Sequence, residues 1–127
     1  MRKSVTASGI VATGPYAHAV ESEGLLFLSG QTPIDPVTGK LIQGGVAEQT
    51  QLCFDNLKSV LQAAGLTLDD VQKVNVYLLD MGNFAVMNAV YEKNFSQPYP
   101  ARTTVQVGGL PLGAEVEIEM VARRPKA

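Results

Sequence analysis

The sequence is poor in the residues that build disulfides and zinc sites. Its 127 residues include one cysteine, Cys53, one histidine, His18, and no tryptophan. A single cysteine excludes an internal disulfide and suits a reducing, cytoplasmic compartment. One cysteine and one histidine are too few for a zinc site, which takes three or four ligands drawn mainly from these two residue types. We therefore expect no metal and no other cofactor.

The sequence also lacks a basic excess and a long apolar run. Ten Lys and Arg residues stand against twelve Asp and Glu, so the net charge is -2. General nucleic-acid binders usually carry a basic excess, and the composition argues against such a partner. No apolar run approaches the roughly 18 residues of a membrane span. No apolar segment follows Arg2 and Lys3 as it would in a signal peptide, so we expect a cytoplasmic protein with no membrane partner.

What the sequence does contain fits one globular domain over residues 1–127. Hydrophobic residues make up 46% of the chain and charged residues 17%, values typical of a packed core and not of disorder. No internal repeat, linker or low-complexity segment interrupts it. Hydrophobic periodicity predicts a helix over residues 50–64 that ends at Gly65, and a second over residues 83–95 that ends before Pro98.

Strands are predicted before, between and after these helices. Residues 17–21 and 25–29 flank a turn and favour a hairpin, and the apolar run in the second of these strands predicts burial on both faces. Residues 74–79 alternate in the way of a half-buried strand. Two more strands, 102–107 and 115–123, are expected to form an antiparallel hairpin. This order of elements indicates an α+β fold with both helices on one face of a mixed sheet.

The last two predicted strands carry the most informative polar residues. In an antiparallel hairpin Thr104 would lie near Glu117, and Arg102 near Glu119, on one polar surface. One interpretation is the ordinary solvated face of a sheet. The other is a site for a small anion, because arginine grips a carboxylate with a planar fork and a neighbouring glutamate can orient a water.

Other chemistry-bearing residues have plainer interpretations. Asn88 lies beside the apolar stripe of the second helix, so its amide must be hydrogen-bonded, either as a structural group or within a site. We interpret His18 as a partly exposed histidine and Cys53 as an inert core residue. The glycine pairs at 44–45 and 108–109 lack the spacing of a phosphate loop and are interpreted as turns.

Three blocks of the sequence, in order along the chain, resemble one known family. The blocks are Gly14–Val20, Phe27–Pro33 with Asp35-Pro36 and Thr38-Gly39 after it, and Pro100–Val105 with the Leu110-Pro111 turn and Val116–Glu119. On these blocks the sequence resembles the RidA family, also called YjgF, of reactive intermediate deaminases. The resemblance extends through nearly the whole chain, including both predicted helices.

This resemblance implies a fold, an assembly and an activity. The fold would be chorismate-mutase-like, in a homotrimer whose sheets form a central barrel with sites between subunits. The activity would be hydrolysis of reactive 2-imino or enamine acids, which serine and threonine dehydratases release, to 2-oxo acids and ammonia. The implied partners are small 2-imino and 2-oxo carboxylic acids, and the reaction needs no cofactor.

The family's motifs assign roles to residues of this sequence by position. Arg102 matches the carboxylate-binding arginine, and Glu117 matches the acidic residue near the attacking water. The matches to substrate-binding positions are Tyr16, Ser29, Gly30, Asn88 and Thr104. Thr104 stands where the family often has cysteine, and we expect this departure to tune the pocket and leave activity intact.

Two other classes of function remain open on the sequence. One is an RNA- or protein-binding regulator or chaperone with the same fold. The other is a deaminase of a different enamine, such as 2-aminomuconate. The presence of Arg102 separates the enzyme from a protein that only binds, because an arginine at this position favours imine hydrolysis.

Overall fold

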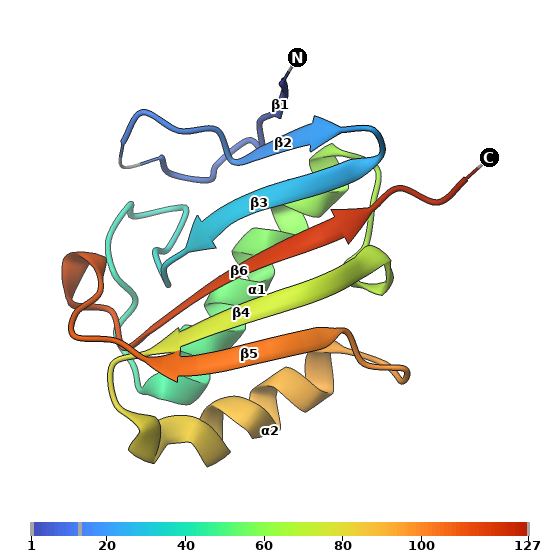
Figure 1. Cartoon of the computed structure of the whole chain (residues 1–127). Coiled ribbons are helices and arrows are strands. Elements are labelled where there is room, and N and C mark those ends of the chain that lie inside the picture. The colour runs from blue at the N-terminus through green and yellow to red at the C-terminus, as the bar shows by residue number, and fades with distance from the viewer. Residues whose placement is uncertain (1, 13, 127) are drawn as a thin grey trace.

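The part of the chain that the structure describes contains six strands and two long helices (Figure 1). The computed structural model describes residues 2–12 and 14–126. In chain order the elements are β1 (Lys3–Val5), β2 (Ala19–Ser22), β3 (Leu25–Gln31), α1 (Val46–Ala63), β4 (Val71–Leu78), α2 (Phe84–Asn94), β5 (Ala101–Gln106) and β6 (Val116–Arg123). One-turn helices precede β4, α2 and β6, at Leu68–Asp70, Met81–Asn83 and Pro111–Gly113.

The strands form one mixed sheet in the order β1-β2-β3-β6-β4-β5. Neighbouring strands are antiparallel except β4 and β5, which run parallel. Helix α1 runs behind the strands and α2 lies along β5, so the helices cover one face and leave the other open (Figure 1). The predicted α+β fold and the first hairpin, β2–β3, are confirmed.

The predicted hairpin between the last two strands is wrong. β5 pairs only with β4, and β6 pairs with β3 and β4, so β4 lies between the two strands. Thr104 is therefore not beside Glu117, and Arg102 is not beside Glu119. The physical reason is the helix between β4 and β5, because a strand–helix–strand crossover returns the chain parallel to the strand it left.

The core lies between the helices and the sheet. Apolar side chains of α1 and of the central strands are fully buried there, among them Phe54, Leu57, Leu61, Val74, Val76, Leu78 and Ile118. Gly65 has φ +76, and the Leu66 N–H donates to the Leu61 carbonyl, which closes α1 where the sequence predicted. None of the described helices is long and apolar enough to cross a membrane.

The open face of the sheet is partly apolar. Phe27 of β3 is 46% exposed and Val105 of β5 is 40% exposed. The prediction that β3 is buried on both faces is therefore wrong for Phe27, because no second layer of this chain covers that side. Both side chains are on the face that the described part of this chain leaves uncovered.

Candidate active site

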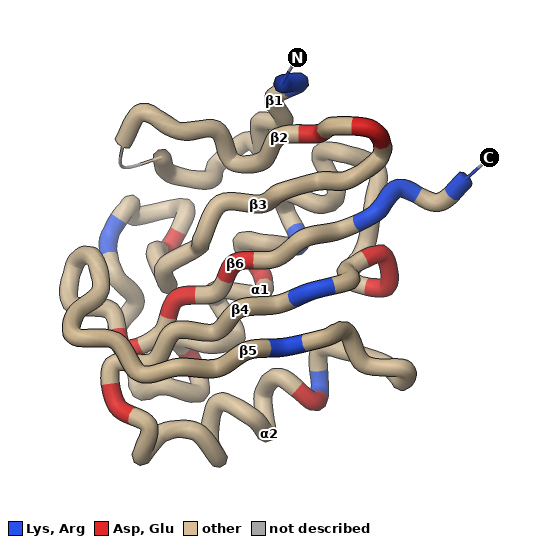
Figure 2. The backbone as a smooth tube through the Cα atoms, in the orientation of Figure 1, with Lys and Arg blue, Asp and Glu red and all other residues tan. Residues whose placement is uncertain are grey.

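The two principal site residues lie on opposite faces of the sheet. Arg102 is registered with Val74, which is fully buried beneath the helices. Glu117 is registered with Tyr77, on the open face. Along the sheet, the basic position of β5 is at the edge and the acidic positions of β6 are in the middle (Figure 2). The sequence predicted one polar surface that holds both residues. Within one chain they instead belong to two separate groups, one on each face of the sheet.

The first group surrounds Arg102. Its Nη1 donates a hydrogen bond of 2.7 Å to Oδ1 of Asn88, which confirms that the Asn88 amide is hydrogen-bonded. The guanidinium carbon lies 4.6 Å from the centre of the Tyr91 ring and 5.4 Å from that of Phe84. A cavity of about 480 Å³ opens here, and it is lined by Asn88, Tyr91, Glu92, Tyr99, Pro100 and Arg102. Asn88 occupies one of the five guanidinium N–H donors, and an arginine in a cavity is suited to binding a carboxylate.

Two hydroxyl groups near Arg102 are buried without a hydrogen-bond partner among the described residues. They belong to Tyr91, whose ring faces the guanidinium, and to Thr104, two residues along the same face of β5. Burial raises the pKa of Tyr91, and the charge of Arg102 acts in the opposite direction. Because the Thr104 hydroxyl is enclosed, any contact of this residue with a ligand would come from its backbone.

The second group lies where β3 meets β6. A Cβ placed on Gly30 would be 2.5 Å from Oε2 of Glu117, so the carboxylate rests directly against the Gly30 backbone. The pairing of β3 with β6 shifts register between Leu28 and Gln31, an irregularity of the kind that often accompanies functional sites. The Ser29 hydroxyl donates to the Ala17 carbonyl at 2.6 Å. Ser29 therefore anchors the segment that carries the predicted Tyr16.

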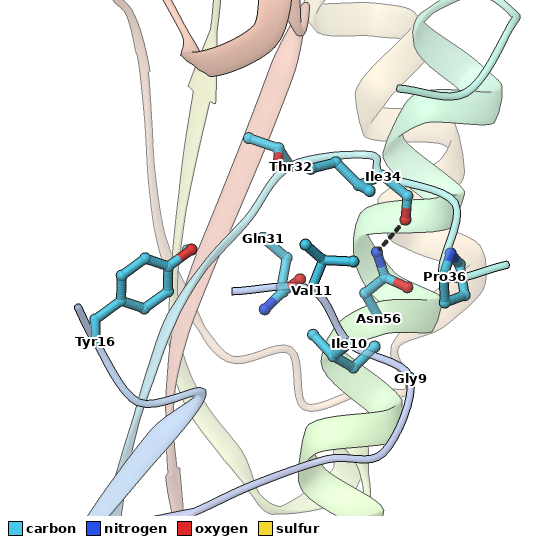
Figure 3. A pocket seen from close by; sticks show the side chains of 10 residues that line it. Gly9, Ile10, Val11, Tyr16, Gln31, Thr32, Ile34, Pro36 and Asn56 are labelled. Carbon is cyan, nitrogen blue, oxygen red and sulfur yellow. Dashed lines mark hydrogen bonds between the residues drawn. The ribbon is translucent and has the colours of Figure 1, made fainter. Parts of the chain in front are cut away.

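Tyr16 borders this second group from the loop before β2. Its side chain is 43% exposed. It lines a cavity of only about 10 Å³ together with Gly30, Gln31 and residues nearer α1. Figure 3 shows the Tyr16 ring apart from the other labelled side chains. Among those other side chains, Asn56 donates a hydrogen bond to the Ile34 carbonyl. A space of this size holds about one water, so this cavity is not the substrate pocket.

The carboxyl groups of Glu117 and Glu119 interact on the open face. Burial raises the pKa of Glu117, and the charge of Glu119 raises it further. Glu119 is held by Asn75, whose Nδ2 donates at 3.2 Å, and by the hydroxyl of Tyr77. The hydrogen bond to Glu119 raises the pKa of Tyr77 to about 12. Glu119 is therefore a fixed negative charge beside Glu117.

The remaining candidates have structural surroundings. His18 is 7% exposed, and its Nδ1 accepts a hydrogen bond of 3.0 Å from the Ala7 N–H. The expectation that His18 is partly exposed is therefore wrong, because the N-terminal segment covers it. Cys53 is buried in the core as predicted, and burial raises the pKa of its thiol. Across residues 2–12 and 14–126, no three His, Cys, Asp or Glu side chains are placed to hold a metal ion.

Sequence reasoning missed the aromatic residues around Arg102. On the sequence, Phe84 and Tyr91 have the spacing of an apolar helix stripe, which predicts a role in the core and not in a site. They stand four residues before and three after Asn88, so all three share one face of α2. This spacing was the available signal, but nothing local to the sequence indicates that β5 places an arginine against that face.

Gly30 offers a direct test of the contact with Glu117. We expect Gly30→Ala to lower turnover about 10- to 100-fold, because the new methyl group displaces the carboxylate and small displacements of reacting groups cost this much. Gly109→Ala is the matched control, since its Cβ would meet nothing within 4 Å. Steady-state kinetics of both variants checks this, and equal rates for the two would show that turnover does not depend on this contact.

The raised pKa of Glu117 predicts the pH dependence of turnover. The family resemblance assigns Glu117 to orient the attacking water, and a carboxylate must be ionised to do so, which predicts that turnover falls as the pH drops through the raised pKa. Glu119→Gln removes a neighbouring negative charge, which lowers the pKa of Glu117 and moves this acid limb to lower pH. The measurement is kcat against pH for both proteins, corrected for spontaneous hydrolysis. If the acid side of the pH profile were the same in Glu119→Gln as in the wild type, the charge of Glu119 would not influence the pKa of Glu117.

Comparison with known proteins identifies the family. A sequence profile described as Endoribonuclease L-PSP matches residues 6–124. A RutC family protein of Pyrococcus horikoshii is 47% identical over 109 residues, which are 86% of each chain. The 2-iminobutanoate/2-iminopropanoate deaminase of Bos taurus is 41% identical over 117 residues, which are 92% of this chain and 85% of the relative.

Solved structures of this family share the fold over nearly the whole chain. RidA from an Antarctic Psychrobacter superposes with a TM-score of 0.92 at 41% identity, covering 96% of this chain and 99% of that one. TdcF of Escherichia coli, solved with bound serine, superposes with a TM-score of 0.90 at 36% identity, covering 97% of this chain and 100% of that one. With the profile, these matches place the chain in the Endoribonuclease L-PSP family, among the RidA and RutC proteins.

Proposed function

We propose that this protein hydrolyses 2-imino and enamine acids to 2-oxo acids and ammonia. The observation that carries the proposal is Arg102, whose guanidinium faces a cavity large enough for a small carboxylic acid. A relative at 41% identity is named a 2-iminobutanoate/2-iminopropanoate deaminase, and TdcF was solved with serine, a small amino acid with a carboxylate. Both names describe ligands that an arginine can hold by the carboxylate.

The proposal includes a homotrimer in which each site forms between two subunits. Arg102 and Glu117 of one chain face opposite sides of the sheet, so one chain alone does not present them to a common substrate. The exposed Phe27 and Val105 lie on the open face, where burial against a second copy would be favourable. We therefore assign Arg102 of one subunit and Glu117 of its neighbour to the same site.

In the proposed reaction, Arg102 binds the substrate carboxylate and thereby fixes the orientation of the adjacent imine carbon. Glu117 accepts a hydrogen bond from a water and directs its oxygen at that carbon. The C–O bond forms as a proton passes from the water, through Glu117, to the imine nitrogen, which gives a carbinolamine. A second proton then passes from the carbinolamine hydroxyl to the amino group, the C–N bond breaks, and ammonia leaves the 2-oxo acid. The imine carbon is already electrophilic, so no covalent nucleophile is needed.

The other predicted residues would shape this pocket. Asn88 holds Arg102, and Gly30 provides the surface against which Glu117 rests. The Ser29 hydroxyl is engaged by a backbone carbonyl, so its contribution would be to position the Tyr16 segment. Thr104 would contribute through its backbone, which explains why threonine can replace cysteine at this position.

The test is a coupled assay. A threonine or serine dehydratase releases the imino acid, and formation of 2-oxobutanoate or pyruvate is followed with and without this protein. We expect the protein to accelerate 2-oxo acid formation beyond the spontaneous rate in proportion to its concentration. No acceleration by a well-folded protein would refute the proposed activity on these substrates.

The description of the family profile supports a second candidate, cleavage of RNA. The net charge of -2 is unfavourable for this function, because binding of the phosphate backbone depends on Lys and Arg. Incubation of the purified protein with labelled single-stranded RNA separates the two candidates. Cleavage that survives Arg102→Ala would support a ribonuclease with a different site, and absence of cleavage would leave the deaminase.

A further inference from the structure

Two aromatic rings of α2 enclose the guanidinium of Arg102. The guanidinium carbon is 4.6 Å from the centre of the Tyr91 ring and 5.4 Å from the centre of the Phe84 ring. Both distances are within the roughly 6 Å over which the negative face of a ring attracts a cation. The arginine therefore has attractive contacts with two rings in addition to its hydrogen bond.

The three contacts come from successive turns of one helix face. Phe84, Asn88 and Tyr91 stand at positions i, i+4 and i+7 of α2. Asn88 accepts from Nη1 at 2.7 Å, which fixes the direction of the N–H groups within the guanidinium plane. The two rings restrict rotation of that plane. Together the contacts select one orientation of a side chain that otherwise has many rotamers.

The Tyr91 ring is itself held in place by the core. Its centre lies 5.7 Å from that of Phe54 and 4.8 Å from that of Phe95, and only 5% of the residue is exposed. Its hydroxyl is buried and has no hydrogen-bond partner among the described residues. The contact with Arg102 thus depends on the ring, and the hydroxyl takes no part in it.

We propose that Phe84 and Tyr91 are positioning residues that hold Arg102 ready for the substrate carboxylate. The inference rests on the proposed function, because it takes Arg102 as the carboxylate-binding group. Without the rings, the guanidinium must lose its freedom when the ligand binds, and this loss weakens binding. Arg102 contacts the carboxylate, which does not itself react, and its hydrogen bond to Asn88 remains when a ring is removed, so we expect loss of a ring to act mainly on binding and much less on the rate at saturation.

The experiment measures binding and turnover separately. The variants are Phe84→Leu, Tyr91→Leu and Tyr91→Phe, and the probe is 2-oxobutanoate, titrated by calorimetry. We expect the Kd to rise about three- to tenfold in each leucine variant. We expect kcat for imine hydrolysis to stay within about twofold. Tyr91→Phe keeps the ring and should bind as the wild type does. Val86→Ala, on an exposed position of α2, is the control.

The outcomes separate this proposal from the proposed function. An unchanged Kd in Phe84→Leu, at wild-type thermal stability, would overturn the positioning role, and this variant decides the question if Tyr91→Leu fails to fold. A weakened Tyr91→Phe would overturn it too, because the hydroxyl would then be the active group. Full activity in Arg102→Ala would instead overturn the proposed function, whatever the ring variants show.

Discussion

Arg102→Ala is expected to lower kcat/KM for imine hydrolysis about 10²- to 10⁴-fold, since it removes a pair of charge-assisted hydrogen bonds. The loss should be this large because, among the described residues of one chain, the cavity lining contains one arginine and no lysine. The coupled assay checks the expectation, and size-exclusion chromatography shows whether the variant keeps the assembly of the wild type.

The matched control for this variant is Arg123→Ala. Arg123 is the last residue of β6, is exposed and does not line the cavity. It should retain wild-type kinetics, so an equal loss in both variants would indicate a general effect of charge. Arg102→Lys is informative as well, because lysine keeps the charge but lacks the planar fork. If Arg102→Ala hydrolysed the imine at the wild-type rate, the proposed site would be wrong.

Local patterns predicted the elements of the fold well. The apolar repeat of α1 predicts the helix, and the glycine after it predicts where the helix ends. Both features depend on residues that lie within a few turns of one another. The turn at Ser22-Glu23-Gly24 joins β2 and β3 for the same reason, and Glu23 and Gly24 both have positive φ. Thr67 and Asp70 form a cap ahead of β4 that is equally local, since the Thr67 N–H donates to the Asp70 carboxylate and the Thr67 hydroxyl accepts from the Asp69 N–H.

The pairing of the last strands could not be predicted in this way. The loop between β5 and β6 contains two adjacent glycines and a proline, which is compatible with a hairpin. β6 nevertheless lies between β3 and β4, where Ile118 and Met120 complete the buried layer. This preference comes from contacts between residues far apart in the sequence, so no local pattern contains it.

The same limit applies to the site. The family's motifs single out Arg102 and Glu117, but the sequence does not indicate the face of the sheet on which each lies. Strand pairing decides this, because one residue of register moves a side chain to the other face. Once the register is known, the separation of Arg102 and Glu117 supports a site shared between subunits. In the hairpin predicted from the sequence, both residues would lie on one surface of one chain, and no second subunit would be needed.

Glu117→Gln is expected to lower kcat about 10²- to 10⁴-fold and to leave the Kd of 2-oxobutanoate within about twofold. Glutamine keeps the size of the side chain and its contact with Gly30 but cannot accept a proton from water. The carboxylate of the ligand is assigned to Arg102, so binding should not depend on Glu117. Single-turnover kinetics and calorimetry measure the two effects.

Glu115→Gln is the control for this substitution, because it makes the same change two residues from Glu117, one residue before β6. It should turn over at the wild-type rate. A weaker Kd with unchanged kcat in Glu117→Gln would mean that Glu117 binds the ligand and does not orient water. The attacking water would then need another partner, and Tyr16 would be the next to examine, since it borders Gly30 and its phenol group can exchange a proton.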